Sequence, residues 1–118
     1  MNSKDEAIIR DLAGEVAEIA ASPTQEGKRQ LWRRLNACDP VRSMVMIDQV
    51  CWNEMNIDDE LTLMCENEEC RGYEQRLRRT LYQWRHFPVD MVVEPFIRVP
   101  KAVHNSGFGV KVQQETAV

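Results

Sequence analysis

The chain has 118 residues, enough for one domain but too few for a complete (β/α)₈ barrel, which needs roughly 250 residues. Hydrophobic residues make up 43% of the chain and charged residues 29%, which excludes wholesale disorder. Nineteen acidic residues against fifteen basic ones leave a net charge of −4, and this balance argues against a nucleic-acid-binding protein.

Two amphipathic helices are predicted at the N-terminal end, over residues 4–37. Ser3 and Glu6 have the spacing of a capping box, and apolar residues at helical spacing follow them. A second start signal, Ser22 followed by Pro23, predicts that another helix begins there. These residues are therefore expected to form a helical pair.

The middle of the chain predicts a strand, a helix and a second strand. The apolar run Met44–Ile47 is typical of a strand covered on both faces. Helical spacing returns over residues 68–86, with Asn67 as a candidate N-cap. A second candidate buried strand covers residues 90–94. Further short segments are candidates: residues 61–64 as a strand or a helical turn, and residues 96–100 and 109–113 as strands.

The polar face of the helix predicted at 68–86 is dominated by arginines at positions 71, 76, 78, 79 and 85. Acidic residues gather in the preceding segment, 54–69, and this order of charges is the one that a helix dipole favours. We therefore expect the arginines to pair with the acidic segment, with nucleic-acid binding as the alternative.

The order of these elements predicts an α/β fold. Residues 44–93 have the pattern of a right-handed βαβ crossover in a parallel sheet. A sheet of two or three strands has open edges, and its apolar faces lack a covering layer. The sequence thus predicts a single partial domain over residues 1–118, made of the helical pair 4–37 and the opening strands and helix of a larger α/β domain at 44–118.

Polar side chains follow the predicted strands at the edge where parallel α/β proteins bind ligands. The candidate substrate-binding residues are Asp48, Gln49, Trp52, Asn53, Glu94 and His104. Carboxylates, amides and an indole suit hydrogen bonding to a polar substrate, and one carboxylate could act in acid–base chemistry. The alternative is structural: Asp48 and Asn53 cap turns, and Trp52 packs in the core.

The four cysteines are spaced unlike the ligand pairs of a zinc site, so no metal site is predicted and ordinary thiols are expected. A thiol or metal protein built on Cys65 and Cys70 is the remaining alternative. The polar N-terminus lacks the apolar core of a signal peptide, and no apolar run is long enough to span a membrane. A cytoplasmic location is therefore expected.

Two segments, Ile47–Met55 and Leu81–Pro95, together with the leading helices, resemble the N-terminal part of uroporphyrinogen-decarboxylase-like proteins of anaerobic bacteria. Corrinoid-dependent methyltransferases and cobalamin-independent methionine synthase belong to the same superfamily. The resemblance implies the start of an incomplete (β/α)₈ barrel, with residues 44–47 and 91–93 as its first strands. It also places Asp48, Gln49, Trp52, Asn53 and Glu94 toward the pocket at the strand ends.

The details of the resemblance favour the methyltransferase branch. Asp48 and Gln49 stand where true uroporphyrinogen decarboxylases have an arginine-rich motif. The family's methyltransferases use a corrinoid protein, and they bind zinc through residues of later strands, so this segment is expected to bind no cofactor itself.

Two functions are therefore expected as alternatives. The first is an N-terminal fragment or split piece of a methyltransferase, inactive alone, with the remainder of the barrel or a corrinoid protein as partner and a small molecule as substrate. The second is a small non-enzymatic α/β binding module that pairs the arginine-rich helix 71–85 with an acidic partner. Neither involves nucleic acid or a membrane, and both allow a homo-oligomer.

Overall fold

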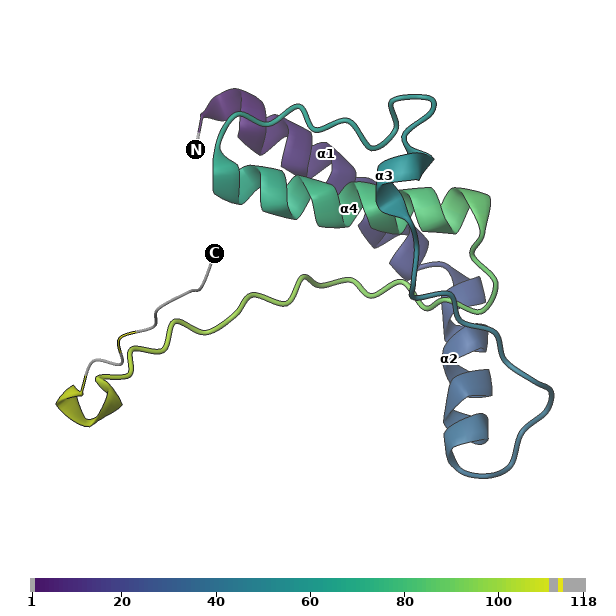
Figure 1. Cartoon of the computed structure of the whole chain (residues 1–118). Coiled ribbons are helices and arrows are strands. Elements are labelled where there is room, and N and C mark those ends of the chain that lie inside the picture. Colours follow the sequence, from purple (N-terminus) through teal and green to yellow (C-terminus); the bar gives the residue numbers. More distant parts are fainter. Residues whose placement is uncertain (1, 111–112, 114–118) are drawn as a thin grey trace.

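The computed structural model describes residues 2–110 and residue 113. Its elements are α1 (Ser3–Ala20), α2 (Pro23–Asn36), α3 (Trp52–Met55), α4 (Glu68–His86) and the 3₁₀ turn η1 (Gly107–Gly109) (Figure 1). Within the described residues there is no β-strand, so the fold is helical and the predicted α/β class is wrong. No described helix is both long enough and apolar enough to cross a membrane.

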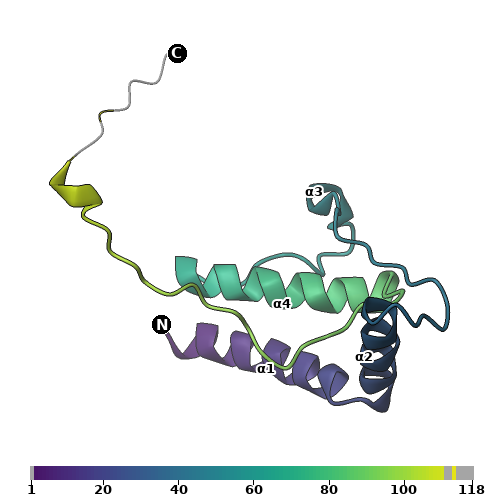
Figure 2. The same cartoon turned by 90° about the horizontal axis from the view of Figure 1, so that it is seen from below.

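The core lies between α1 and α4, which pack side by side (Figures 1 and 2). The buried apolar cluster consists of Val16, Ala20, Leu77, Leu81 and Val93. The first four belong to the apolar stripes of these two helices, because residues three or four apart share one helix face. The apolar faces of the two amphipathic helices therefore pack against each other.

The helix starts agree in part with the predicted signals. Asn67 caps α4, since its side-chain oxygen accepts hydrogen bonds from the N–H groups of Glu69 and Cys70. The cap of α1 is Asn2, which accepts from the Asp5 N–H, so the predicted capping box at Ser3 and Glu6 is wrong by one residue. Helices α1, α2 and α4 otherwise lie where they were predicted.

Two buried carboxylates join the starts of α1 and α4 to the segment between α3 and α4. Glu74 of α4 accepts hydrogen bonds of 2.8–3.0 Å from the N–H groups of Met64 and Cys65. Asp5 of α1 accepts from the N–H groups of Glu66 and Asn67 at 3.1 and 3.0 Å. These four N–H groups face side chains instead of a neighbouring strand.

The electrostatics of the two carboxylates follow from these contacts. The hydrogen bond from Asn67 is the main reason why the pKa of Asp5 lies below its usual value. Burial alone would raise the pKa of Glu74, but the N–H donors and the Arg78 guanidinium outweigh it, so this pKa is also lowered.

The segments predicted as the first two strands, 44–47 and 91–93, are extended but form no ladder, so the βαβ unit and the opening of a barrel are wrong. The Asp90 N–H donates to the Val45 carbonyl at 3.1 Å. The Val45 N–H is bound by the Asp90 side chain at 2.8 Å, and Arg42 holds this carboxylate with two hydrogen bonds. A side chain thus replaces the second backbone partner that a strand pair needs.

Side chains of α2 donate hydrogen bonds to backbone carbonyls of the second predicted strand, residues 90–94. Trp32 Nε1 donates to the Asp90 carbonyl at 2.8 Å, and Arg29 Nη2 donates to the Val93 carbonyl at 3.2 Å. Val93 is 1% exposed because it packs on α1 and α4. The predicted burial is therefore confirmed at Val93, while Met91 and Val92 are half-buried; helices cover Val93, and the carbonyls of Asp90 and Val93 are not available for a sheet.

The remaining predicted strands do not form among the described residues either. Residue 61 lies in a turn, and residues 62–64 and 96–100 are irregular. The candidate at 109–113 includes residues 111 and 112, which lie outside the described residues. After α4 the chain runs as an extended segment beneath the helices and then away from them toward η1 (Figure 1).

Candidate functional site

A cavity of about 250 Å³ lies between α3 and α4. A second hollow of about 320 Å³ shares three residues with it, Trp52, Asn53 and Arg79. The rest of the first cavity is lined by Asn56, Leu61, Leu63 and Gln75. Two of the predicted substrate-binding residues, Trp52 and Asn53, therefore meet here with residues of α4.

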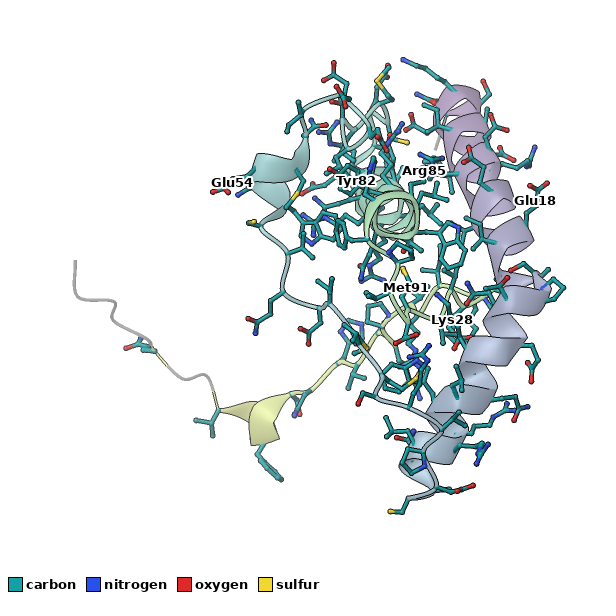
Figure 3. All side chains as sticks on the ribbon, turned by 90° about the vertical axis from the view of Figure 1, so that its right-hand side faces the viewer. Glu18, Lys28, Glu54, Tyr82, Arg85 and Met91 are labelled. Atoms are coloured by element: carbon teal, nitrogen blue, oxygen red, sulfur yellow. The ribbon has the colours of Figure 1, made fainter. Side chains whose placement is uncertain are left out.

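Aromatic packing holds α3 against α4. The Trp52 ring meets Tyr82 in an edge arrangement with centroids 6.1 Å apart, and it lies 6.5 Å from Phe87. Figure 3 shows Tyr82 on the side of α4 that faces α3, while Glu54 of α3 points outward. Trp52 therefore packs against other aromatic rings, as the structural alternative predicted, and it also lines the cavity.

Most arginines of α4 are engaged by oxygen atoms of the chain. The hydrogen bonds run from Arg71 to the Cys65 carbonyl, from Arg76 to the Arg98 carbonyl, from Arg78 to Glu74 and the Glu60 carbonyl, and from Arg85 to Glu15. Glu60 of the acidic segment also forms an ion pair with Arg85 at 3.6 Å and a hydrogen bond with His86 Nε2 at 2.8 Å. The expected pairing of these arginines with the acidic segment is confirmed at Glu60.

Arg79 differs from these arginines. Its guanidinium carbon lies 5.2 Å from the centre of the Trp52 ring, and in residues 2–110 and 113 no oxygen accepts a hydrogen bond from it, in contrast to the other arginines of α4. A guanidinium stacked on a ring keeps its N–H donors at its edge. Arg79 therefore presents a positive charge and free donors to the cavity.

Amide side chains surround this charge. Asn53 and Gln75 form no side-chain hydrogen bond with the described part of the chain. Asn56 has a structural task, because its oxygen accepts from the Leu61 N–H at 3.1 Å and its amide donates to Thr62 at 3.0 Å. A guanidinium with two free amides and no acidic side chain in the lining of the first cavity suits a carboxylate.

The other predicted site residues lie elsewhere. Asp48, Gln49 and His104 are exposed, and none of them lines the two cavities beside α3. Glu94 lies near α2, with one carboxylate oxygen 3.8 Å from Arg29 Nη2. The six residues were grouped because parallel strands end at one edge, and without a sheet that reason does not hold. Their contact with a substrate stays a prediction.

Sequence reasoning did not single out Gln75 or distinguish Arg79 from its neighbours. The available signal is the spacing of Gln75, Arg79, Tyr82 and His86, which places them on one face of α4. Which arginines face the acidic segment depends on the path of residues 56–67, and local spacing does not reveal that path.

The cysteines give no support to a thiol function at Cys65. Burial is the main cause that raises the pKa of this thiol to about 11, so it stays protonated and unreactive at neutral pH. Cys70 is also buried, whereas Cys38 and Cys51 are exposed. In the described part of the chain, no group of three or more potential ligands is placed to hold a metal ion.

Comparison of the chain with protein-family models, with curated proteins and with solved structures finds no match. The resemblance to uroporphyrinogen-decarboxylase-like proteins therefore stays a prediction. The same holds for the corrinoid protein, the zinc and the substrate that it implies. The class that the elements themselves define is a small helical protein with a cationic cavity beside α4.

Proposed function

We propose that the chain is a non-enzymatic binding module in which Arg79, in the cavity beneath α3, binds the carboxylate group of a small ligand. The observation that carries this proposal is the contrast among the arginines of α4. Arg71, Arg76, Arg78 and Arg85 donate to oxygens of the chain, whereas Arg79 is held over Trp52 with its donors free.

The size and chemistry of the cavity support a small anionic ligand. Its volume of about 250 Å³ lies just below the roughly 300–1,000 Å³ that is usual for ligand sites. Arginine binds carboxylates through two parallel hydrogen bonds, and partial burial against an aromatic ring strengthens such bonds. The half-buried Leu61 and Leu63 add apolar surface to the lining beside the guanidinium.

The test is a titration of the isotope-labelled chain with benzoate, followed by NMR at the Trp52 indole N–H. Benzamide, which has the same ring without the charge, is the ligand control. We expect saturable shifts with benzoate, an affinity that is reduced roughly tenfold or more in Arg79→Gln, and weaker binding at high salt.

The matched control variant is Arg33→Gln, which removes an exposed arginine of α2 that pairs with Glu26 at 3.6 Å. This variant is expected to bind benzoate as the parent chain does. Equal binding of benzamide and benzoate, or equal affinities of the parent and Arg79→Gln, would contradict the proposal.

A second candidate function is favoured by the apolar side chains of the extended segments: the chain serves as part of a larger, methyltransferase-like assembly. These side chains are Val41, Val45, Met46, Phe96, Val99, Val103 and Phe108, with exposed fractions between 49% and 103%. Large apolar surfaces mark contacts with partners, and these side chains recur along two extended segments of the described chain that belong to no sheet. A partner polypeptide would cover it and complete the substrate pocket.

The second candidate predicts that the isolated chain binds a hydrophobic dye and self-associates as its concentration rises. Dye fluorescence and light scattering measure both properties. Val99→Ser together with Val103→Ser should reduce them without changing the helix content. A monomer that binds no dye at any concentration would exclude this function.

A cytoplasmic location belongs to the same proposal. Its support is chemical: Cys38 and Cys51 are free and exposed, and such thiols persist in a reducing compartment. Cell fractionation of the tagged full chain tests this location, and recovery in an oxidising compartment would contradict it.

A further inference from the structure

Residues 93–98, which we call the strap, run as an extended segment beneath α1 and α4 (Figure 2). The strap is fixed at its first residue, Val93, which is buried. The Val93 N–H donates to Gln25 at 2.8 Å, and its carbonyl accepts from Arg29 at 3.2 Å. Side chains of α2 therefore hold this end.

The other end of the strap is fixed by α4. Arg76 Nη1 donates to the carbonyl of Arg98 at 2.8 Å, and the Arg98 guanidinium lies 5.7 Å from the centre of the Phe96 ring. Between the two ends, Phe96 and Ile97 are 55% and 37% exposed, although each has a large apolar side chain. Hydrogen bonds therefore hold the strap at both ends, whereas the side chains of Phe96 and Ile97 between them stay partly exposed.

A cavity of about 420 Å³ lies between the strap and the helices. Its apolar walls are formed by Val16, Leu77, Met91, Val92, Phe96 and Ile97. A neighbouring hollow of about 250 Å³ shares Val16, Leu77, Phe96 and Ile97 with it. The cavity has the volume of a typical small-molecule site, and an apolar occupant would cover the exposed parts of Phe96 and Ile97.

Arg79 is the residue that the lining of this cavity shares with the first cavity beside α3. Arg76 and Arg98 also line the cavity under the strap, and its acidic lining residue, Glu94, lies close to Arg29. The lining therefore combines apolar side chains with three arginines and a single acidic residue. This arrangement complements an anionic head group and an apolar tail.

We infer that the ligand of Arg79 is an amphipathic carboxylate, such as a medium-chain fatty acid, whose tail lies in the cavity under the strap. The inference rests on the proposed carboxylate site and names the class of its ligand. Transfer of methylene groups from water to the apolar walls adds to the binding free energy. The affinity is therefore expected to rise by about fourfold for each methylene group that the cavity covers.

Isothermal titration of the full chain with butanoate, hexanoate, octanoate and decanoate, each kept below its micelle-forming concentration, tests the inference. We expect one bound ligand per chain and an affinity that rises along the series. Ile97→Ser, which makes one wall of the cavity polar, should flatten the rise for the longer acids. Val99→Ser is the matched control, because Val99 lies just beyond the strap and is 63% exposed.

The outcomes separate this inference from the proposed function. Binding of benzoate and of all four acids with equal affinity would overturn the inference and leave the carboxylate site standing. If neither benzoate nor any fatty acid binds, the proposed function fails, and the inference fails with it. Decanol binding as tightly as decanoate, with no effect of Arg79→Gln, would show an apolar cavity that is independent of Arg79 and would also overturn the inference.

Discussion

The pair α1–α4 and the extended segments 41–50 and 94–106 all carry large apolar side chains, yet these side chains end in opposite environments. The helices bury Val16, Leu77 and Leu81 against each other. The extended segments leave side chains such as Met46 and Val103 64% and 75% exposed. A helix satisfies its own backbone and needs only a second apolar stripe, whereas an extended segment needs a backbone partner as well.

The polar groups follow the same division. Around the helix pair, N–H groups of residues 64–67 are bound by Asp5 and Glu74, and α2 binds carbonyls of residues 90 and 93. Beyond residue 98, the hydrogen bonds of the described residues are local ones within residues 105–110, and none of them reaches the helices α1, α2 or α4. The extended segments therefore pack against the helices only where side chains of the helices bind their backbone.

The comparison predicts that truncation in the helix pair is far more costly than truncation in the extended segments. Leu81 is 2% exposed, so Leu81→Ala is expected to lower the free energy of unfolding by about 2–5 kcal/mol. Val99→Ala is the control, and its effect should stay within about 0.5 kcal/mol. Urea unfolding followed by circular dichroism measures both changes, and equal losses would break the comparison.

The buried carboxylate of Glu74 is predicted to be the next most important group. Glu74→Gln replaces an acceptor of several charge-assisted hydrogen bonds by a neutral amide, which should cost about 1.5–3 kcal/mol of unfolding free energy. Glu18→Gln, an exposed change on α1, is the control and should have little effect. A loss of the same size in both variants would show that Glu74 does not hold the segment at 64–67.

Acid should weaken the contacts that the buried carboxylates make. The pKa values of Asp5, Glu74 and Asp90 are lower in the folded chain than in ordinary carboxyls, and for Asp90 the main cause is the Arg42 guanidinium. Their contribution is therefore complete above about pH 5 and is lost as the pH falls below about 4, toward the folded-state pKa values. Unfolding midpoints measured across this range should fall, and Asp90→Asn should make the fall shallower. A midpoint independent of pH would contradict this prediction.

The smallest effect is expected at the helix starts. Asn67 caps α4 through two hydrogen bonds, so Asn67→Ala should cost about 1 kcal/mol. Ser22 stands at the N-cap of α2 without a side-chain cap, and its buried hydroxyl has no partner in the described structure. Ser22→Ala should therefore change the urea midpoint less than Asn67→Ala does, and the reverse order would contradict the account.

The helices could be predicted from the sequence because their evidence is local. The stripe that contains Val16 and the one that contains Leu77 and Leu81 recur at helical spacing, and Asn67 stands directly before the second. The absence of strands from the described residues could not be predicted in the same way. An apolar run such as residues 91–93 indicates burial, but it does not say whether a sheet or a helix pair will cover it.

The residues of the candidate site could likewise be predicted only in part from the sequence. Trp52 and Asn53 were found because polar and aromatic residues follow an apolar run, although the sheet that motivated the choice does not form. Arg79 could not be separated from its neighbours, since the partners of Arg78 and Arg85 come from residue 60 and from α1, far away in the chain. Long-range pairing determines which donors remain free.

Amide hydrogen exchange measured residue by residue tests most directly the claim that a closed helix pair carries an open, extended segment. The account predicts slow exchange in the core turns of α4 around Leu77 and Leu81, and fast exchange over residues 99–106. Protection of both regions to the same degree in the isolated chain would contradict it, because it would place the extended segment in a sheet or a core of its own.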